Sequence, residues 1–165
     1  MKRRSFQLIL VLATAGCSGT EPNDHGTFEA RLTGVASLQF TGESQAGVVY
    51  TEVNPEGQFT ISMFSNEGNV TRSITIGCLG LEAPSSGSHS LAPVVERCVG
   101  RYSRFTLEPL MIVEEAESSE GTLFVRRADE TGTEGTFSFS GILVQGTDSL
   151  GSVQASGSFS AIPGP

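Results

Sequence analysis

Three cysteines, Cys17, Cys78 and Cys98, are the residues of this sequence with the most specific chemistry. A thiol can be alkylated, bind a metal or form a disulfide. In a compartment that permits disulfides, Cys78 and Cys98 would form a pair that stabilises the fold by about 3 kcal/mol. The alternatives are free buried thiols or a zinc site, but two thiols without nearby His or Asp partners make a poor zinc set.

Catalysis would need a nucleophile, a base and an acid in one place, and few residues qualify. The two histidines are His25 and His89, and the aspartates are scattered at positions 24, 129 and 148. Ser88 and Ser90 flank His89, but adjacency in sequence does not make a catalytic array, and no nucleophile elbow is present. We therefore predict a protein that is not an enzyme and needs no cofactor.

The N-terminus has the pattern of an export signal. A positive cluster at Lys2–Arg4 precedes a mostly apolar run, Phe6–Ala13, and small residues follow at Thr14–Gly16. The apolar run is too short to cross a bilayer, which takes roughly 20 residues. The pattern predicts a signal peptide over residues 1–16 that is removed from the mature chain.

The stretch Ala13-Thr14-Ala15-Gly16-Cys17 resembles the lipobox of bacterial lipoproteins, although Thr14 stands where that family usually has Leu. The resemblance implies cleavage after Gly16, a diacylglyceryl group on the Cys17 thiol and acylation of the new amine. Two or three acyl chains hold a protein at a membrane where one is marginal. The alternative is an ordinary secretory signal with a chance cysteine. Without an Asp after Cys17, the enterobacterial sorting rule favours the outer membrane, facing either side.

The mature chain would be acidic. Removing 16 of the 165 residues leaves 149, which suits one domain. Lys2, Arg3 and Arg4 are lost, so 7 basic residues face 18 acidic ones, and 7 − 18 gives a net charge of −11. Such a charge argues against nucleic acid and against electrostatic attachment to anionic lipid. The membrane contact is therefore expected through the lipid on Cys17.

The rest of the chain is organised as short strands. Residues 17–26 are small and polar and predict a flexible tether, and residues 27–163 predict one all-β domain. Apolar residues alternate there with the period of half-buried strands. The alternating sets are Phe28, Ala30 and Leu32; Ala36, Leu38 and Phe40; Phe59, Ile61 and Met63; Ile74, Ile76 and Cys78; Phe137, Phe139 and Leu143; and Val153, Ala155 and Phe159.

Several connections are also predicted. A separate strand is expected over Val48–Val53, and Leu79–Pro93 should be the main irregular segment. Glu114–Glu120 is rich in glutamate and predicts a solvated loop; a calcium site there is an alternative, but this segment has no Asp. The last three strands, from Leu123 onward, should form a meander.

A short pattern, Gly-x-Phe followed by Ser or Thr, occurs at Gly57–Thr60, Gly135–Ser138 and Gly157–Ser160. Glycine for bends and phenylalanine for the core explain it. With Gly121–Val125, the last two copies resemble the C-terminal half of small uncharacterised bacterial lipoproteins. That resemblance implies an antiparallel β-sandwich and an envelope location, but no reaction.

A noncatalytic binding protein is the function these observations favour. The partner would be an envelope protein, contacted through a strand edge or the Leu79–Pro93 loop, or alternatively a glycan. Glycan sites use aromatic platforms, and the chain has no Trp, so the candidate ligand-binding residues are Tyr50, Tyr102 and His89. Tyr50 and Tyr102 on one open face would favour a glycan, and their burial would remove a glycan site built on these tyrosines. A less favoured alternative, a hydrolase, would need His89 to meet acids in a pocket.

Overall fold

The computed structural model describes residues 26–50, 55–92 and 98–164, and its nine regular elements are all β-strands. They are β1 (Gly26–Gly34), β2 (Leu38–Val49), β3 (Gln58–Glu67), β4 (Val70–Leu79), β5 (Gly87–Ser90), β6 (Cys98–Leu107), β7 (Leu110–Asp129), β8 (Gly132–Gln145) and β9 (Asp148–Pro163). None of the described residues belongs to a helix long and apolar enough to span a bilayer.

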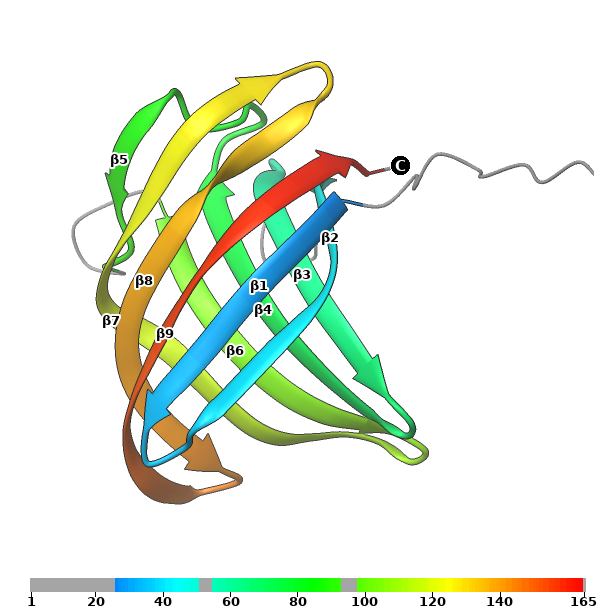
Figure 1. Ribbon diagram of the computed structural model, residues 1–165, viewed down its shortest axis with the longest axis vertical. Coiled ribbons are helices and arrows are strands. Elements are labelled where there is room, and N and C mark those ends of the chain that lie inside the picture. Colours follow the sequence, from blue (N-terminus) through cyan, green and yellow to red (C-terminus); the bar gives the residue numbers. More distant parts are fainter. Residues whose placement is uncertain (1–25, 51–54, 93–97, 165) are drawn as a thin grey trace, which may run out of the picture.

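Eight of the strands close into one antiparallel barrel (Figure 1). Around the wall the order is β1, β2, β3, β4, β6, β7, β8 and β9, and β9 pairs with β1. The 20-residue strand β7 closes the circle, because its first half pairs with β6 and its second half pairs with β8. The short β5 pairs with β7 beyond the start of β6.

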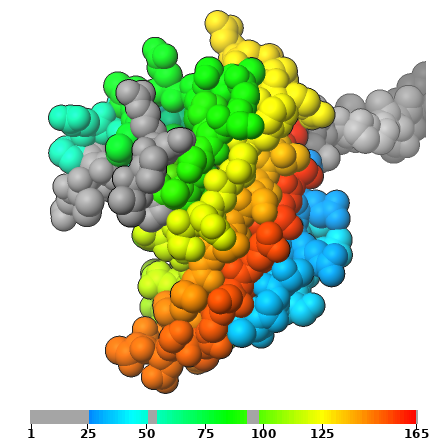
Figure 2. Space-filling model, turned by 90° about the vertical axis from the view of Figure 1, so that its left-hand side faces the viewer, coloured from blue at the N-terminus to red at the C-terminus, as the bar shows by residue number. Residues whose placement is uncertain are grey.

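The all-β prediction is confirmed, but the predicted sandwich is wrong. A sandwich and a barrel both put alternate residues of each strand into one core, so alternation does not distinguish them. Pairing does, and here every neighbouring pair of barrel strands is hydrogen-bonded around a full turn. Figure 2 shows β7, β8 and β9 as adjacent bands of this continuous wall.

The barrel has two different ends. At the end that we call the N-terminal end, β1 begins, β2, β4 and β9 end, and a tight turn joins β7 to β8 (Figure 1). At the other end, which we call the hairpin end, four tight connections join β1 to β2, β3 to β4, β6 to β7 and β8 to β9. Asn69 ties two of these hairpins together, because its side-chain amide donates to the Glu108 carbonyl at 2.9 Å.

The interior of the barrel is the hydrophobic core. The alternating sets predicted from the sequence are largely confirmed, since Phe28, Ile61, Ile74, Phe139 and Val153 are all buried. The largest apolar side chains with almost no exposure are Leu32, Ile61, Met63, Ile74, Ile76, Leu91, Leu123, Val125 and Phe139. The meander of β7, β8 and β9 is confirmed as well.

Glycines face phenylalanines across several strand pairs. Gly135 on β8 pairs with Phe159 on β9, and two positions along, Phe137 pairs with Gly157. A Cβ atom built on Gly135 would lie 3.0 Å from the Phe159 ring, and one on Gly157 would lie 2.8 Å from the Phe137 ring. Two copies of the Gly-x-Phe pattern therefore cover each other's glycines, which the sequence alone did not indicate.

The disulfide between Cys78 and Cys98 is confirmed. The two residues are direct cross-strand partners on β4 and β6, with a Cα–Cα distance of 4.0 Å, and both are buried. Cys78 follows Ile74 and Ile76 on the inward face of β4, as the alternation predicted. The bond therefore fastens two wall strands at the N-terminal end.

Two predicted connections are wrong. Glu114–Glu120 is not a loop but part of β7, where Glu114 and Glu117 face arginines of β6. The predicted break before Val48 is also absent, because β2 runs unbroken from Leu38 to Val49. Small inward residues in the middle of β2 hide its alternation; the rest of the predicted Val48–Val53 strand lies partly outside the described residues.

Candidate functional site

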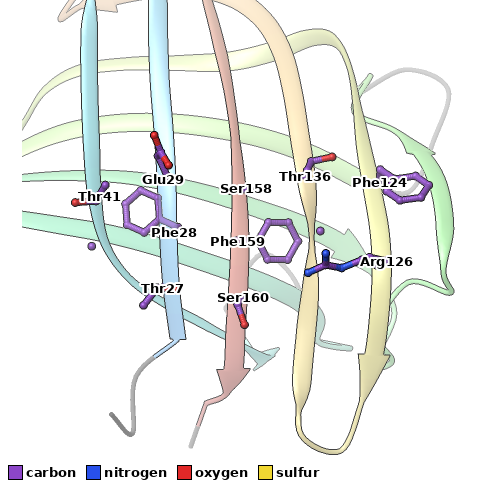
Figure 3. A pocket seen from close by; sticks show the side chains of 12 residues that line it. Thr27, Phe28, Glu29, Thr41, Phe124, Arg126, Thr136, Ser158, Phe159 and Ser160 are labelled. Atoms are coloured by element: carbon purple, nitrogen blue, oxygen red, sulfur yellow. The ribbon is translucent and has the colours of Figure 1, made fainter.

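An open groove of about 880 Å³ crosses the outside of the barrel wall (Figure 3). It extends over five neighbouring strands, in the order β2, β1, β9, β8 and β7. Its lining is Thr27, Phe28, Glu29, Thr41, Gly42, Phe124, Arg126, Gly135, Thr136, Ser158, Phe159 and Ser160. We call it the wall groove.

Strand register places the polar residues of the groove in a row. Glu29 on β1 pairs with Thr41 on one side and Ser158 on the other. Ser158 in turn pairs with Thr136, which pairs with Phe124. Because neighbouring strands lie about 4.8 Å apart, this row runs straight across the wall. Its middle members, Ser158 and Thr136, have short side chains, so the surface is low between the longer ones.

Two aromatic residues and two glycines also line the groove. Phe28 pairs with Gly42 across β1 and β2, and Phe159 pairs with Gly135 across β9 and β8. Figure 3 shows each ring in the gap beside its own strand. Both rings are buried in the core, so the wall under the groove is backed by aromatic side chains.

Charged and aromatic side chains stand at the margins. Glu29 is exposed and accepts a hydrogen bond of 2.7 Å from the Gln39 side-chain amide. On the other side, Arg126 donates to the Glu134 carboxylate at 2.6 Å and remains largely exposed. Phe124 is 46% exposed, a large apolar side chain beside these polar groups.

The arginine margin belongs to a hydrogen-bonded network at the end of β7. Arg127 and then Arg126 donate to Glu134, and these hydrogen bonds lower the pKa of the Glu134 carboxyl. The Thr131 hydroxyl and Arg127 lower the pKa of Asp129 to about 2. Both carboxylates are therefore ionised at neutral pH and hold the arginines in place.

The side chains of the wall groove can hydrogen-bond a ligand. Serine and threonine hydroxyls can donate and accept hydrogen bonds, while a carboxylate accepts and a guanidinium donates. Phe124 adds an apolar surface against which the flat face of a ligand could pack. Within residues 26–50, 55–92 and 98–164, no three His, Cys, Asp or Glu side chains gather as a metal site.

The candidate residues predicted from the sequence are not brought together. Tyr102 is buried, with 2% exposure, against Phe40 in the core, and this burial raises the pKa of its phenol. Tyr50 is 65% exposed at the N-terminal end. His89 lies on β5, where its Nε2 contacts the Ser85 carbonyl at 2.7 Å. The two tyrosines therefore form no common platform, and the glycan site expected on them is absent. Cys17 and His25 lie outside the described residues.

The sequence reasoning missed the groove. One signal was available: in β9 the outward positions are occupied by polar residues, among them Ser152, Gln154, Ser158 and Ser160. Phe124 was a second signal, because it is a large apolar residue at the outward position between Leu123 and Val125, which face inward. Comparison of the chain with protein-family models, curated proteins and solved structures finds no match.

Proposed function

We propose that this chain is a noncatalytic cell-envelope lipoprotein that binds a glycan segment in the wall groove. In this proposal residues 1–16 are removed, the lipid on Cys17 holds the mature protein at the outer membrane, and the barrel recognises its ligand outside the bilayer. The leader supports the first part through its positive cluster, short apolar run and lipobox-like ending.

The observation that best supports glycan binding is a row of side chains across the groove. The row consists of Thr41, Glu29, Ser158, Thr136 and Phe124. A sugar presents hydroxyls at its edge and carbon-bound hydrogens on its face. Glu29 and the hydroxyl side chains can bind the edge, and Phe124 can pack against the face. The groove is also open along the wall, which suits a chain of sugars better than an isolated small molecule.

A second candidate is contact with an envelope protein, and the β6–β7 hairpin supports it. Leu110 is 77% exposed and Ile112 is 61% exposed at the hairpin end, with Leu107 and Met111 beside them. Residues 110–112 are paired with β6, but pairing of β7 with β8 begins only at Glu115 among the described residues. An exposed apolar strand edge is a surface to which another chain can add a strand.

Calorimetry with the mature chain carrying Cys17→Ser, to keep it free of lipid, tests the groove. Oligosaccharides of the cell envelope, including peptidoglycan fragments, are titrated into this protein and into its Phe124→Ala variant. We expect about tenfold weaker binding for Phe124→Ala, because a good aromatic contact contributes about 1.4 kcal/mol. Leu110→Ser at the hairpin end is the matched control. Oligosaccharide binding that Phe124→Ala leaves unchanged would exclude the groove as the glycan site, and the absence of any oligosaccharide binding would favour the second candidate.

Mass spectrometry of the protein from cells tests the anchor independently. The expected N-terminal peptide begins at Cys17 and carries acyl chains, and Cys17→Ser should abolish this modification. An unmodified Cys17 would remove the lipoprotein part of the proposal while leaving the glycan part open to calorimetry.

A further inference from the structure

Four large apolar side chains form an exposed patch at the N-terminal end of the barrel. Tyr50 is 65% exposed, Leu79 is 60% exposed, and Leu81 and Val49 are exposed by about half. They come from the end of β2 and from the end of β4 with the residues that follow it. We call this set the Tyr50 patch.

The members of the patch are held close together by Gly57 and β3. A Cβ atom built on Gly57 would lie 2.9 Å from a ring carbon of Tyr50 and 2.5 Å from a methyl carbon of Leu81, so both side chains lie over this glycine. The Phe59 amide donates to the Gly80 carbonyl at 2.8 Å, which fixes the segment between Leu79 and Leu81 beside β3. Tyr50 and Leu81 therefore share one surface, and Val49 and Leu79 are their neighbours in the chain.

The position of the patch relates it to the proposed anchor. Gly26, the first described residue, pairs with Ser44, and Tyr50 lies six residues further along the same strand. At 3.3 Å per residue, Tyr50 is about 20 Å from that pair. The nine residues from Cys17 to Gly26 can span at most about 30 Å. A bilayer that holds acyl chains on Cys17 is therefore within reach of the patch.

The chemistry of the patch fits the boundary of a bilayer. Tyrosine has an apolar ring with a polar end and is enriched where membranes meet water. Moving a leucine side chain out of water lowers the free energy. The exposed charged neighbours, Glu56 and Glu82, are acidic, so electrostatic attraction to anionic lipid does not contribute. A contact here would be apolar and would favour zwitterionic over anionic lipid.

We propose that the Tyr50 patch inserts into the membrane surface beside the lipid on Cys17, as a second contact that orients the barrel. The inference rests on the lipid anchor of the proposed function. It adds a consequence that the lipid alone would not produce: the N-terminal end faces the bilayer and the hairpin end faces away. The wall groove then lies on the side of the barrel, open to ligands next to the membrane.

Fluorescence can test this orientation, because the chain has no Trp and a single substitution introduces one reporter. The lipidated protein carrying Tyr50→Trp is placed in phosphatidylcholine vesicles with brominated acyl chains. The matched control is Leu110→Trp, which puts the reporter at another exposed position, at the hairpin end. Flotation of the vesicles shows in both cases whether the protein is bound.

The expected result is a blue shift and severalfold loss of emission for Tyr50→Trp, with unchanged emission for Leu110→Trp. Adding Leu79→Ser and Leu81→Ser should reverse the quenching without releasing the protein, and anionic vesicles should weaken it. Protein that floats while Tyr50→Trp stays unquenched overturns the inference, as does equal quenching of both reporters. Protein that does not float would instead show that the lipid anchor is absent.

A second copy of the chain is the competing occupant of the patch. Lipid-free protein carrying both Cys17→Ser and Tyr50→Trp is therefore diluted without vesicles. Emission that is independent of concentration supports the membrane contact. A blue shift that grows with protein concentration shows that the patch is covered by self-association and overturns the proposal.

Discussion

The two sides of the barrel fill the same interior in different ways. Strands β3, β4 and β6, which we call the aliphatic half, contribute Ile61, Met63, Ile74 and Ile76 together with the disulfide. Strands β8, β9 and β1, the glycine half, instead oppose phenylalanine to glycine across the strand pairs. The aliphatic half combines these aliphatic chains and a covalent bond with the buried Phe59 and Tyr102, whereas the glycine half repeatedly places rings over residues without side chains.

The outer faces of the two halves differ as well. Short serine and threonine side chains line the wall groove on the glycine half, among them Thr136, Ser158 and Ser160. The outer face of the aliphatic half carries longer charged side chains, such as Arg104, which pairs with Glu114 at 2.8 Å. The groove therefore lies where the outward side chains are short.

Removing one ring should have the largest effect on the glycine half. Phe159→Ala leaves a cavity over Gly135 that the glycine cannot fill, so we expect a loss of about 3–5 kcal/mol in the free energy of unfolding. Urea denaturation measures it. Ile61→Val in the aliphatic half is the control, with an expected loss of about 1 kcal/mol. Equal losses would mean that removing the Phe159 ring leaves no larger cavity than removing one methylene group from Ile61.

Removing the disulfide from the aliphatic half should lower the free energy of unfolding by slightly less than Phe159→Ala does. Replacing Cys78 and Cys98 together by alanine frees a loop with a sequence separation of 20, and we expect a loss of about 3 kcal/mol. The wild-type protein denatured under reducing conditions should agree with the double variant. A midpoint that does not move with reduction would contradict this role of the bond.

Replacing each of two buried serines by alanine should change the free energy of unfolding in opposite directions. The Ser118 hydroxyl accepts a hydrogen bond of 3.0 Å from the Gly100 amide, so Ser118→Ala should lower stability by about 1–2 kcal/mol. The Ser44 hydroxyl is fully buried without a hydrogen-bond partner. Ser44→Ala should therefore raise stability by up to about 1 kcal/mol, because the unpaired hydroxyl is lost. A loss with Ser44→Ala would reveal a partner for this hydroxyl, such as a bound water.

The smallest effect on stability is expected from protonation of Asp129 by acid, at the edge of the glycine half. Asp129 has a pKa of about 2, lowered by hydrogen bonds from Thr131 and Arg127, whereas its value in an unfolded chain is near 3.8. A depressed pKa means that the stabilisation is complete above about pH 4 and disappears as the pH falls toward 2. NMR titration of the Asp129 carboxyl measures the pKa, and Thr131→Ala should raise it. An unchanged value would show that the Thr131 hydrogen bond does not form in solution.

The fold and the site differed in how far the sequence could predict them. Alternation identified the inward residues of most strands, and the inward position of Cys78 made its disulfide plausible. It failed for β2, where small inward residues such as Ser44 and Ala46 hide the period. It also failed for the first half of β7, where Glu114 and Glu117 looked like a loop because their partners, Arg104 and Arg101, are far away in sequence.

The sequence by itself determined that the chain is built of strands, which residues of most of them face inward, and that two cysteines are placed to pair, because each depends on local alternation. Only the tertiary structure decided that the sheet closes into a barrel, that Gly135 meets Phe159, and that Thr41, Glu29, Ser158, Thr136 and Phe124 form one row. Closure and register depend on which strands pair, and those contacts join residues distant in the chain.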